Sequence, residues 1–345
     1  IDGDVTENHG QLDIWVVKLD ENGNIQWQKS LGGSKDDVSY SVKQASDGGY
    51  IIAGETASLD GDVTGLHGNV DFWVVKLSSD GILEWQKTLG GSHAEIASDV
   101  VQDDDGNYIV VGYASSNDGD VTGQHGILDY WIVKLNSIGE LQWQTALGGS
   151  EPDFGRCIVP SNDGGYLITG GTASSNGDVQ GNNGGSEFWL VKVDSIGEFV
   201  WQQTYGGNMA EDGFSICNTN DNGFALAGYA WSNNTGDLVG SINQGKNDFW
   251  IVKLAPETVP VNEVQNNNAT HLNIYPNPTN LFITLQLPAA ENEWNISISN
   301  LQGQVVFQQI IQNGDQADIS TLANGLYMVE ATAGGKMLRG KVVKN

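Results

Sequence analysis

The sequence is short of several kinds of residue, and each shortage narrows what the protein can be. Its only cysteines, Cys157 and Cys217, have no recognisable disulfide or metal-binding spacing, and we expect buried, inert thiols. Basic side chains number 15 against 43 acidic ones, so the negative field disfavours binding to nucleic acids and to anionic membrane surfaces. No apolar run approaches the length of a membrane span, which predicts no membrane insertion.

The acidic charge is concentrated in one part of the chain. Residues 1–270 hold 11 basic and 38 acidic side chains, whereas residues 271–345 hold 4 and 5. The first part therefore favours neutral or cationic partners. Proline is also scarce, with 7 residues, while 46 glycines and 11 tryptophans are typical of short packed strands joined by tight turns.

Tryptophans mark an internal repeat of 58 residues. One series is Trp15, Trp73, Trp131 and Trp189, with Trp250 following after 61 residues, and a second is Trp27, Trp85, Trp143 and Trp201. One unit, residues 71–116, contains four strand-like runs rich in Val, Ile, Trp and Tyr, separated by turns of Asp, Asn and Gly. This pattern predicts an all-β fold built from repeats.

The first run of each unit is apolar on both sides. In DFWVVKL, Phe72 and Val74 point to one face of the strand, while Trp73, Val75 and Leu77 point to the other. A strand of this kind must be covered on both faces. Stacking four-stranded antiparallel sheets around an axis, as in a β-propeller, does this most simply. A β-solenoid is the alternative, although its coils are usually much shorter than this unit.

The number of units sets the predicted number of blades. Four units are complete, and they begin near Asp13, Asp71, Asp129 and Glu187. A fifth contributes only its first strand, Asp248 to Leu254. We therefore predict a β-propeller over residues 1–254, with four complete four-stranded blades and a partial fifth. Either the last strand closes a small ring, or further blades precede the sequence; a start inside a repeat favours a larger, truncated ring.

The composition changes after the repeats. Residues 255–271 are polar, contain Pro and Asn, have no hydrophobic period and read as a linker. Residues 272–345 again contain strand-like runs, which predicts a second, small β domain. This domain resembles the type A C-terminal sorting domain of the type IX secretion system. The residues that carry the resemblance are Tyr275, Pro276, Asn277 and Pro278, the turn from Asn300 to Gly303, Leu322, Gly325, Leu326, Tyr327, Lys341 and Lys344.

The resemblance implies a fold, a destination and a partner. The expected fold is a small Ig-like β-sandwich, and the expected partner is the type IX secretion machinery of a Bacteroidota bacterium. The protein would then be secreted or held at the outer-membrane surface. An ordinary Ig-like module that binds sugar is the alternative. The upstream repeats also resemble propeller repeats of secreted proteins from the same bacteria, which carry a fold but no established activity.

Connectors between units have the spacing of a calcium-binding loop. Asp60, Asp62, Thr64 and Asp71 stand at positions one, three, five and twelve of such a loop. The same register recurs at the four residues Asp118, Asp120, Thr122 and Asp129. Calcium bound there would be structural. A cation-free connector, in which Asp side chains cap turns, is the alternative.

Other polar residues have simpler explanations. His9, His67 and His125 recur in the connectors, where a loop hydrogen bond explains them better than catalysis or zinc. Asp–Gly pairs such as Asp47-Gly48 are expected to form turns. The repeated tryptophans are expected to lie in the core. Trp231 replaces the small residues of the other units and is a candidate contact residue.

The leading functional hypothesis is a non-catalytic, secreted or cell-surface module for binding or adhesion, with a glycan or a protein as ligand. No nucleophile elbow, phosphate-binding loop or dinucleotide motif is present, and we predict no enzyme activity. The alternative is a non-catalytic fragment of an extracellular polysaccharide-degrading enzyme whose catalytic domain lies upstream. A passive spacer is a third reading.

Overall fold

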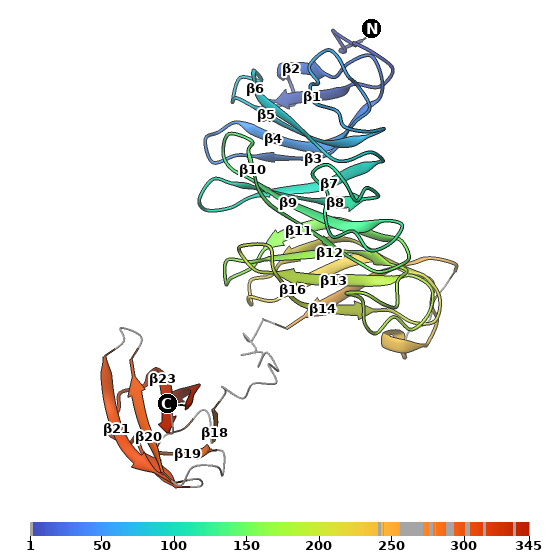
Figure 1. The fold of residues 1–345 in the computed structure, drawn as a ribbon. Coiled ribbons are helices and arrows are strands. Elements are labelled where there is room, and N and C mark those ends of the chain that lie inside the picture. Colours follow the sequence, from blue (N-terminus) through green and yellow to red (C-terminus); the bar gives the residue numbers. More distant parts are fainter. Residues whose placement is uncertain are drawn as a thin grey trace. The chain divides into compact units, whose positions relative to one another are not determined.

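The chain folds as two separate compact units, Ile1–Glu257 and Thr258–Asn345. The computed structural model describes residues 3–240, 243, 245–255, 272–275, 279, 281–287, 293–300, 304–312, 315–333 and 336–344. Both units are all-β (Figure 1), and the only helical element among these residues is a single 3-10 turn, η1 (Gly236–Leu238). Apart from Ala255, the predicted linker 255–271 lies outside the described residues.

The described residues of the first unit form seventeen strands, all paired antiparallel with their neighbours. They are β1 (Ile14–Leu19), β2 (Ile25–Leu31), β3 (Asp37–Gln44), β4 (Tyr50–Thr56), β5 (Asp71–Leu77), β6 (Leu83–Leu89), β7 (Glu95–Gln102), β8 (Tyr108–Ala114), β9 (Asp129–Leu135), β10 (Leu141–Leu147), β11 (Asp153–Pro160), β12 (Tyr166–Thr172), β13 (Glu187–Val193), β14 (Phe199–Tyr205), β15 (Glu211–Asn218), β16 (Phe224–Ala230) and β17 (Asp248–Leu254). Each strand-like run predicted from the sequence of the repeat forms one of these strands.

The grouping of strands into sheets differs from the predicted grouping. Three sheets have four strands: β3-β4-β5-β6, β7-β8-β9-β10 and β11-β12-β13-β14. A two-stranded sheet, β1-β2, precedes them, and a three-stranded sheet, β15-β16-β17, follows them. Each complete sheet therefore combines the last two strands of one sequence unit with the first two of the next, and three sheets are complete instead of the predicted four.

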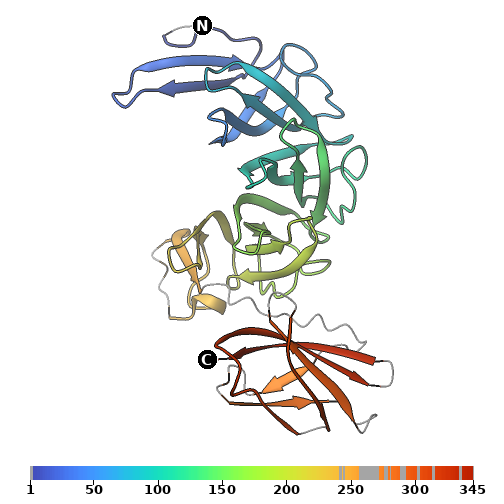
Figure 2. The same cartoon turned by 90° about the vertical axis from the view of Figure 1, so that its left-hand side faces the viewer.

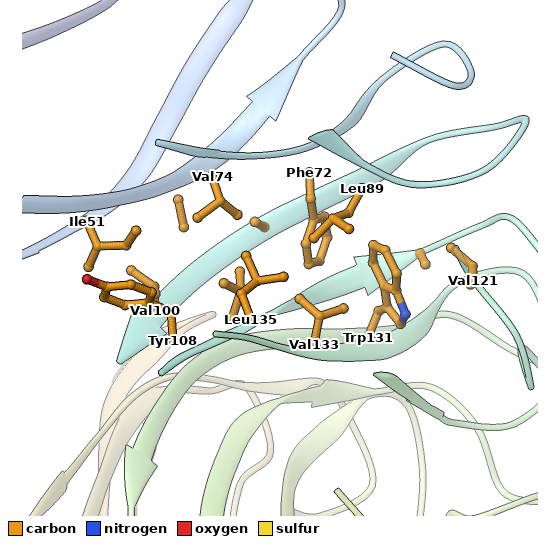
Figure 3. Close-up of a cluster of buried hydrophobic side chains, with 14 of the residues drawn as sticks. Ile51, Phe72, Val74, Leu89, Val100, Tyr108, Val121, Trp131, Val133 and Leu135 are labelled. Atoms are coloured by element: carbon orange, nitrogen blue, oxygen red, sulfur yellow. The ribbon is translucent and has the colours of Figure 1, made fainter. Parts of the chain in front are cut away.

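Neighbouring sheets pack face to face in chain order. One buried cluster joins β4–β6 to β7–β10, and Figure 3 shows Phe72 and Val74 facing Trp131 and Val133 across the gap between the sheets. The ring centroids of Phe72 and Trp131 are 4.5 Å apart. The equivalent pair in the next junction, Tyr130 and Trp189, is 4.4 Å apart. Each such ring pair adds about 1 kcal/mol to the stabilisation from apolar burial.

The end sheets leave part of this core uncovered. Trp73, Trp131 and Trp189 are fully buried, as predicted, but Trp15 on β1 is 43% exposed because no sheet covers its outer face. The two-stranded and three-stranded sheets lie at opposite ends of the stack (Figures 1 and 2). The prediction of buried thiols is wrong, since Cys217 is exposed and Cys157 is half-buried; both thiols are free.

A β-bulge interrupts the strand that comes first in the chain in each four-stranded sheet of the first unit and in its three-stranded sheet. In β3, β7, β11 and β15 the pairing skips one residue, and these residues are Tyr40, Ser98, Arg156 and Phe214. A bulge of this kind re-aims its side chain and is common near functional sites. A glycine stands opposite each bulge; a Cβ at Gly112 would lie 2.0 Å from the carbonyl oxygen of Ile96.

The second unit is a pair of antiparallel sheets around one core. Its strands are β18 (Asn273–Tyr275), β19 (Phe282–Gln286), β20 (Trp294–Ser299), β21 (Val305–Ile311), β22 (Gln316–Asp318), β23 (Gly325–Ala333) and β24 (Lys336–Lys344). The sheets have the orders β18-β19-β22 and β21-β20-β23-β24. Ile283 and Leu285 of the smaller sheet share a buried cluster with Trp294 and Ile296 of the larger one.

Candidate functional site

The predicted calcium loops are held by hydrogen bonds to backbone. In the first loop, Asp60 Oδ1 accepts the N–H of Ser34 at 2.7 Å, and Asp62 Oδ2 accepts the N–H of Gly32 at 3.3 Å. Thr64 lies further along the connector, and its hydroxyl oxygen is 2.5 Å from Nε2 of Gln86. The early residues of the loop thus tie it to the connector that follows β2.

The second loop repeats this arrangement one sheet later. Asp118 Oδ1 accepts the N–H of Ser92 at 2.7 Å, and Asp120 Oδ2 accepts the N–H of Gly90 at 3.2 Å. Nε2 of Gln144 donates to the Thr122 hydroxyl at 2.5 Å. In the described residues, no group of three or more His, Cys, Asp or Glu side chains is arranged to hold a metal ion. The contacts fit the turn-capping alternative, and calcium binding stays a prediction.

The closing residues of the two loops bind the connector histidines. Asp71 Oδ2 lies 2.7 Å from Nδ1 of His67, and Asp129 Oδ2 lies 3.2 Å from Nδ1 of His125. The same pair in the first connector, His9 and Asp13, is 2.8 Å apart. The predicted loop hydrogen bonds of the histidines are therefore confirmed.

The Asp–Gly pairs form the predicted turns and also neutralise buried lysines. Lys76 pairs with Asp47 at 2.8 Å and Lys192 pairs with Asp163 at 2.7 Å, and both lysines are fully buried. The Lys192 ammonium and the Ser161 hydroxyl lower the pKa of Asp163 to about 2, against the opposing effect of burial. Sequence analysis missed these pairs, although the lysine recurs at the sixth position of the first run in every unit.

Trp231 is exposed, as a contact residue would be. Its side chain is 42% accessible, and its backbone N–H donates to Glu211 Oε1 at 3.2 Å. It follows the end of β16, and in the described part of the chain its ring stacks on no other aromatic ring. Its role as a contact residue stays a prediction.

The structure brings a second set of repeat-breaking residues together on the bulged strands. They occupy three repeat positions, which are the bulge itself, the residue two places before it, and the partner of that residue on the second strand. We call the following residues the bulge row: Tyr40, Glu55, Tyr113, Phe154, Arg156, Asp212, Phe214 and Tyr229. At these positions the repeats differ in residue type, whereas core positions such as that of Trp73, Trp131 and Trp189 keep one residue type.

Arg156 lies at the centre of the bulge row. Its guanidinium carbon is 5.3 Å from the ring centroid of Phe154 and 5.1 Å from that of Phe214, so two aromatic rings hold it. Its Nη2 donates to Asp212 Oδ2 at 3.3 Å. The ring of Tyr113 meets that of Phe154 edge to face at 5.0 Å, which extends the contact into the next sheet.

Tyr40 and Glu55 form the other end of the bulge row. The Tyr40 hydroxyl donates to Glu55 Oε1 at 3.2 Å, and the Tyr40 side chain is 54% exposed. Burial, and then the Glu55 charge, raise the pKa of Tyr40 to about 12. Burial likewise raises the pKa of Glu55 and, against the pull of Arg156, that of Asp212. The row thus combines aromatic rings, one cation and two carboxyl groups on a rigid scaffold.

The second unit contains the predicted sorting residues. Tyr327 is buried and its hydroxyl donates to the Ala323 carbonyl at 2.8 Å, while Leu322 packs against the core. Gly325 begins β23, and Lys341 and Lys344 lie on β24. The backbone of Tyr275 ends β18, and Pro276, Asn277, Pro278 and Gly303 lie outside the described residues.

The second unit matches a known family from the start of β18 onwards. The family model for the secretion system C-terminal sorting domain matches residues 273–345. These residues are a secretion system C-terminal sorting domain. The sorting domain directs the protein to the cell exterior or the cell surface and implies an interaction with the type IX secretion machinery. In the described residues, no helix is long and apolar enough to cross a membrane.

The solved structures that the chain resembles share little sequence identity with it. The extracellular domain of a putative hybrid two-component system from B. thetaiotaomicron is 11% identical, with a TM-score of 0.32, over 90% of this chain and 38% of that one. A protein of unknown function from Dyadobacter fermentans is 11% identical, with a TM-score of 0.38, over 93% and 79%. A GH32 β-fructofuranosidase from Bombyx mori is 11% identical, with a TM-score of 0.33, over 92% and 78%. No curated protein matches the chain.

Proposed function

We propose that the first compact unit, which contains all the repeats, is a non-catalytic binding or adhesion module. Its contact surface is the bulge row, and its ligand is a glycan or a protein. One observation carries the proposal: residues whose type differs between the repeats lie together on the first two strands of successive sheets. Variable residues on a repeated, well-packed scaffold are typical of binding surfaces. A passive spacer would need no such surface. Export by the sorting domain would present the surface outside a Bacteroidota cell.

The placement of the carboxyl groups favours binding over catalysis. Glu55 stands on the β3–β6 sheet and Asp212 on the β15–β17 sheet, with two complete sheets between them. Glycosidases generally need two carboxyl groups about 5–10 Å apart, facing each other across the scissile bond. Asp212 is also engaged by Arg156, and Glu55 by Tyr40. We therefore propose no catalytic role for the bulge row.

The architecture behind this proposal has two parts. We propose that the stacked sheets belong to a β-propeller, because their first strands contact one another from sheet to sheet and both faces of the inner sheets are apolar. We also propose that the paired sheets of the sorting domain form an Ig-like sandwich.

A binding assay with a matched variant tests the proposed function. The labelled full chain is applied to a panel of immobilised polysaccharides and extracellular proteins. Tyr40→Ser/Phe214→Ser introduces the residue that Ser98 already provides at the same bulge, so we expect it to fold. We expect binding to at least one coating, weakened at least tenfold in the double variant. Binding to none, or equal binding by both proteins, would overturn the proposal.

A further inference from the structure

We infer that the ligand of the bulge row is a neutral polysaccharide chain, laid across the first strands of several consecutive sheets. The inference rests on the proposed binding function and narrows it to one class of ligand. It draws on three features of the row: its exposed rings, its unsatisfied polar atoms and its charge.

Exposed aromatic rings stand at the two ends of the bulge row. Tyr40 and Phe214 are each about half exposed, although a small residue, Ser98, suffices at the same bulge in another sheet. A large ring left in water at such a position has a cost that core packing does not explain. Sugar rings present apolar C–H faces that stack on aromatic rings and hydroxyl groups at their edges, so they match a surface of rings beside polar groups.

The polar groups between these rings are not fully satisfied by the protein. Eight buried side-chain atoms have no hydrogen-bond partner in the described residues, and three of them, Glu55 Oε2, Arg156 Nε and Asp212 Oδ1, belong to the bulge row. Native proteins leave few such atoms, and those that remain concentrate at functional sites. A chain of hydroxyl groups, with its ordered water, supplies both donors and acceptors to groups of this kind.

The charge of the row and of the repeats selects a neutral ligand. The residues up to 270 carry 38 acidic and 11 basic side chains, and this field repels polyanions such as uronate or sulfated polymers. Arg156, the one cation of the row, is already paired with Asp212. A neutral polymer incurs no such penalty.

The extent of the row indicates a chain instead of a single sugar. Its residues come from β3 and β4, from β8, from β11, and from β15 and β16, which are four successive sheets. Tyr113 meets Phe154 across one junction between sheets, Arg156 meets Phe214 across the next, and strand β3 contacts β7 at the third, so the row spans these sheets. Stacked sheets are spaced by up to about 10 Å, more than one sugar residue spans. A polymer, and not a single sugar, is therefore the ligand expected to contact residues on several of these sheets at once.

Affinity electrophoresis separates the ligand classes. The full chain runs through native gels that contain a neutral polymer (mixed-linkage β-glucan, xyloglucan, galactomannan or starch) or a polyanion (polygalacturonate or alginate). We expect retardation by at least one neutral polymer and by neither polyanion. Tyr40→Ser/Phe214→Ser should weaken this affinity at least tenfold.

A second variant provides the control. Phe199→Leu removes another exposed aromatic ring and introduces the residue found at the equivalent positions Leu83 and Leu141, and it should leave retardation unchanged, because Phe199 lies outside the bulge row. Retardation by polyanions alone, or loss in Phe199→Leu but not in the double variant, would overturn the inference. If the double variant loses binding to coated proteins while no neutral polymer retards the wild type, the proposed function survives and the polysaccharide inference fails.

Discussion

At the scale of single residues, the closest backbone contacts lie opposite the bulges. Gly54, Gly112, Gly170 and Gly228 face Ser39, Ala97, Gly155 and Gly213, and the carbonyl just before each bulged segment crosses over them. A Cβ at Gly112 would lie 2.0 Å from the Ile96 oxygen and 2.8 Å from the Phe72 ring. Neither the backbone nor the packed ring has room to move. The bulge that presents a variable side chain therefore requires a glycine beside it.

Gly112→Ala tests this requirement. We expect a loss of about 2–4 kcal/mol in the free energy of unfolding, because the added methyl group forces the strands of the bulge apart. Gly245→Ala is the control, since the nearest atom to its Cβ would be 3.9 Å away, and it should change stability by less than about 0.5 kcal/mol. Chemical unfolding of the full chain gives both values. Equal stabilities for the two variants would contradict the argument.

Asp153 is a buried acid in an unfavourable electrostatic setting. It accepts the N–H of Gly149 at 2.8 Å and hydroxyl groups from Thr172 and Ser174, yet Asp129 lies across Gly148 from it. Burial, which outweighs these hydrogen bonds, raises the pKa of Asp153 to about 6, and the Asp129 charge adds to the rise. A carboxyl group whose folded-state pKa is raised favours folding below its unfolded value of about 4 and loses that contribution as pH rises through 6.

Asp153→Asn isolates this pH dependence. The amide is neutral at every pH, so the variant does not lose stability between about pH 4 and pH 7 as the wild type does. We expect the free energy of unfolding of the variant, minus that of the wild type, to rise by about 3 kcal/mol from pH 4 to pH 7. Denaturant unfolding at pH 4, 5, 6 and 7 measures it. A difference that stays constant with pH would show that Asp153 does not titrate there.

At the scale of strands and sheets, sequence periodicity located the elements but not their partners. Alternating apolar runs and Asp/Gly turns predict nearly every strand of the repeat unit, because they reflect local chemistry. A repeat looks the same whichever strand is counted first, so the pattern could not place the sheet boundary between β2 and β3. Hydrogen bonding across that boundary decides the grouping, and it depends on tertiary packing.

The bulge row escaped detection for a related reason. Tyr40, Ser98, Arg156 and Phe214 are 58 residues apart, but they have no residue type in common, and a bulge leaves no periodic signal. Trp231 stood out in the sequence only because it replaces uniformly small residues. Comparing the repeats position by position would have found the variable positions; only the fold shows that Arg156, Asp212 and Phe214 meet.

At the scale of the whole molecule, charge and function divide between the two units. The repeat unit carries nearly all the excess acid, and the sorting domain has its own core and a nearly balanced charge. An acidic surface attracts divalent cations, which are available outside the cell to which the sorting domain sends the protein. Calcium is therefore worth testing on the full chain, even though hydrogen bonds account for the connector geometry.

Asp62→Asn/Asp120→Asn distinguishes a calcium ligand from a turn cap. Asn keeps an oxygen that can accept the N–H of Gly32 or Gly90, but it removes the charge that a calcium site needs. On the calcium hypothesis, 5 mM calcium in place of chelator raises the wild-type melting temperature, because a ligand of the folded state stabilises it. The double variant should lose that rise while keeping the melting temperature measured in chelator. Magnesium at equal concentration controls for screening. If calcium and magnesium act alike, or the variant responds as the wild type does, these connectors are turn caps and the ion plays no part in the fold.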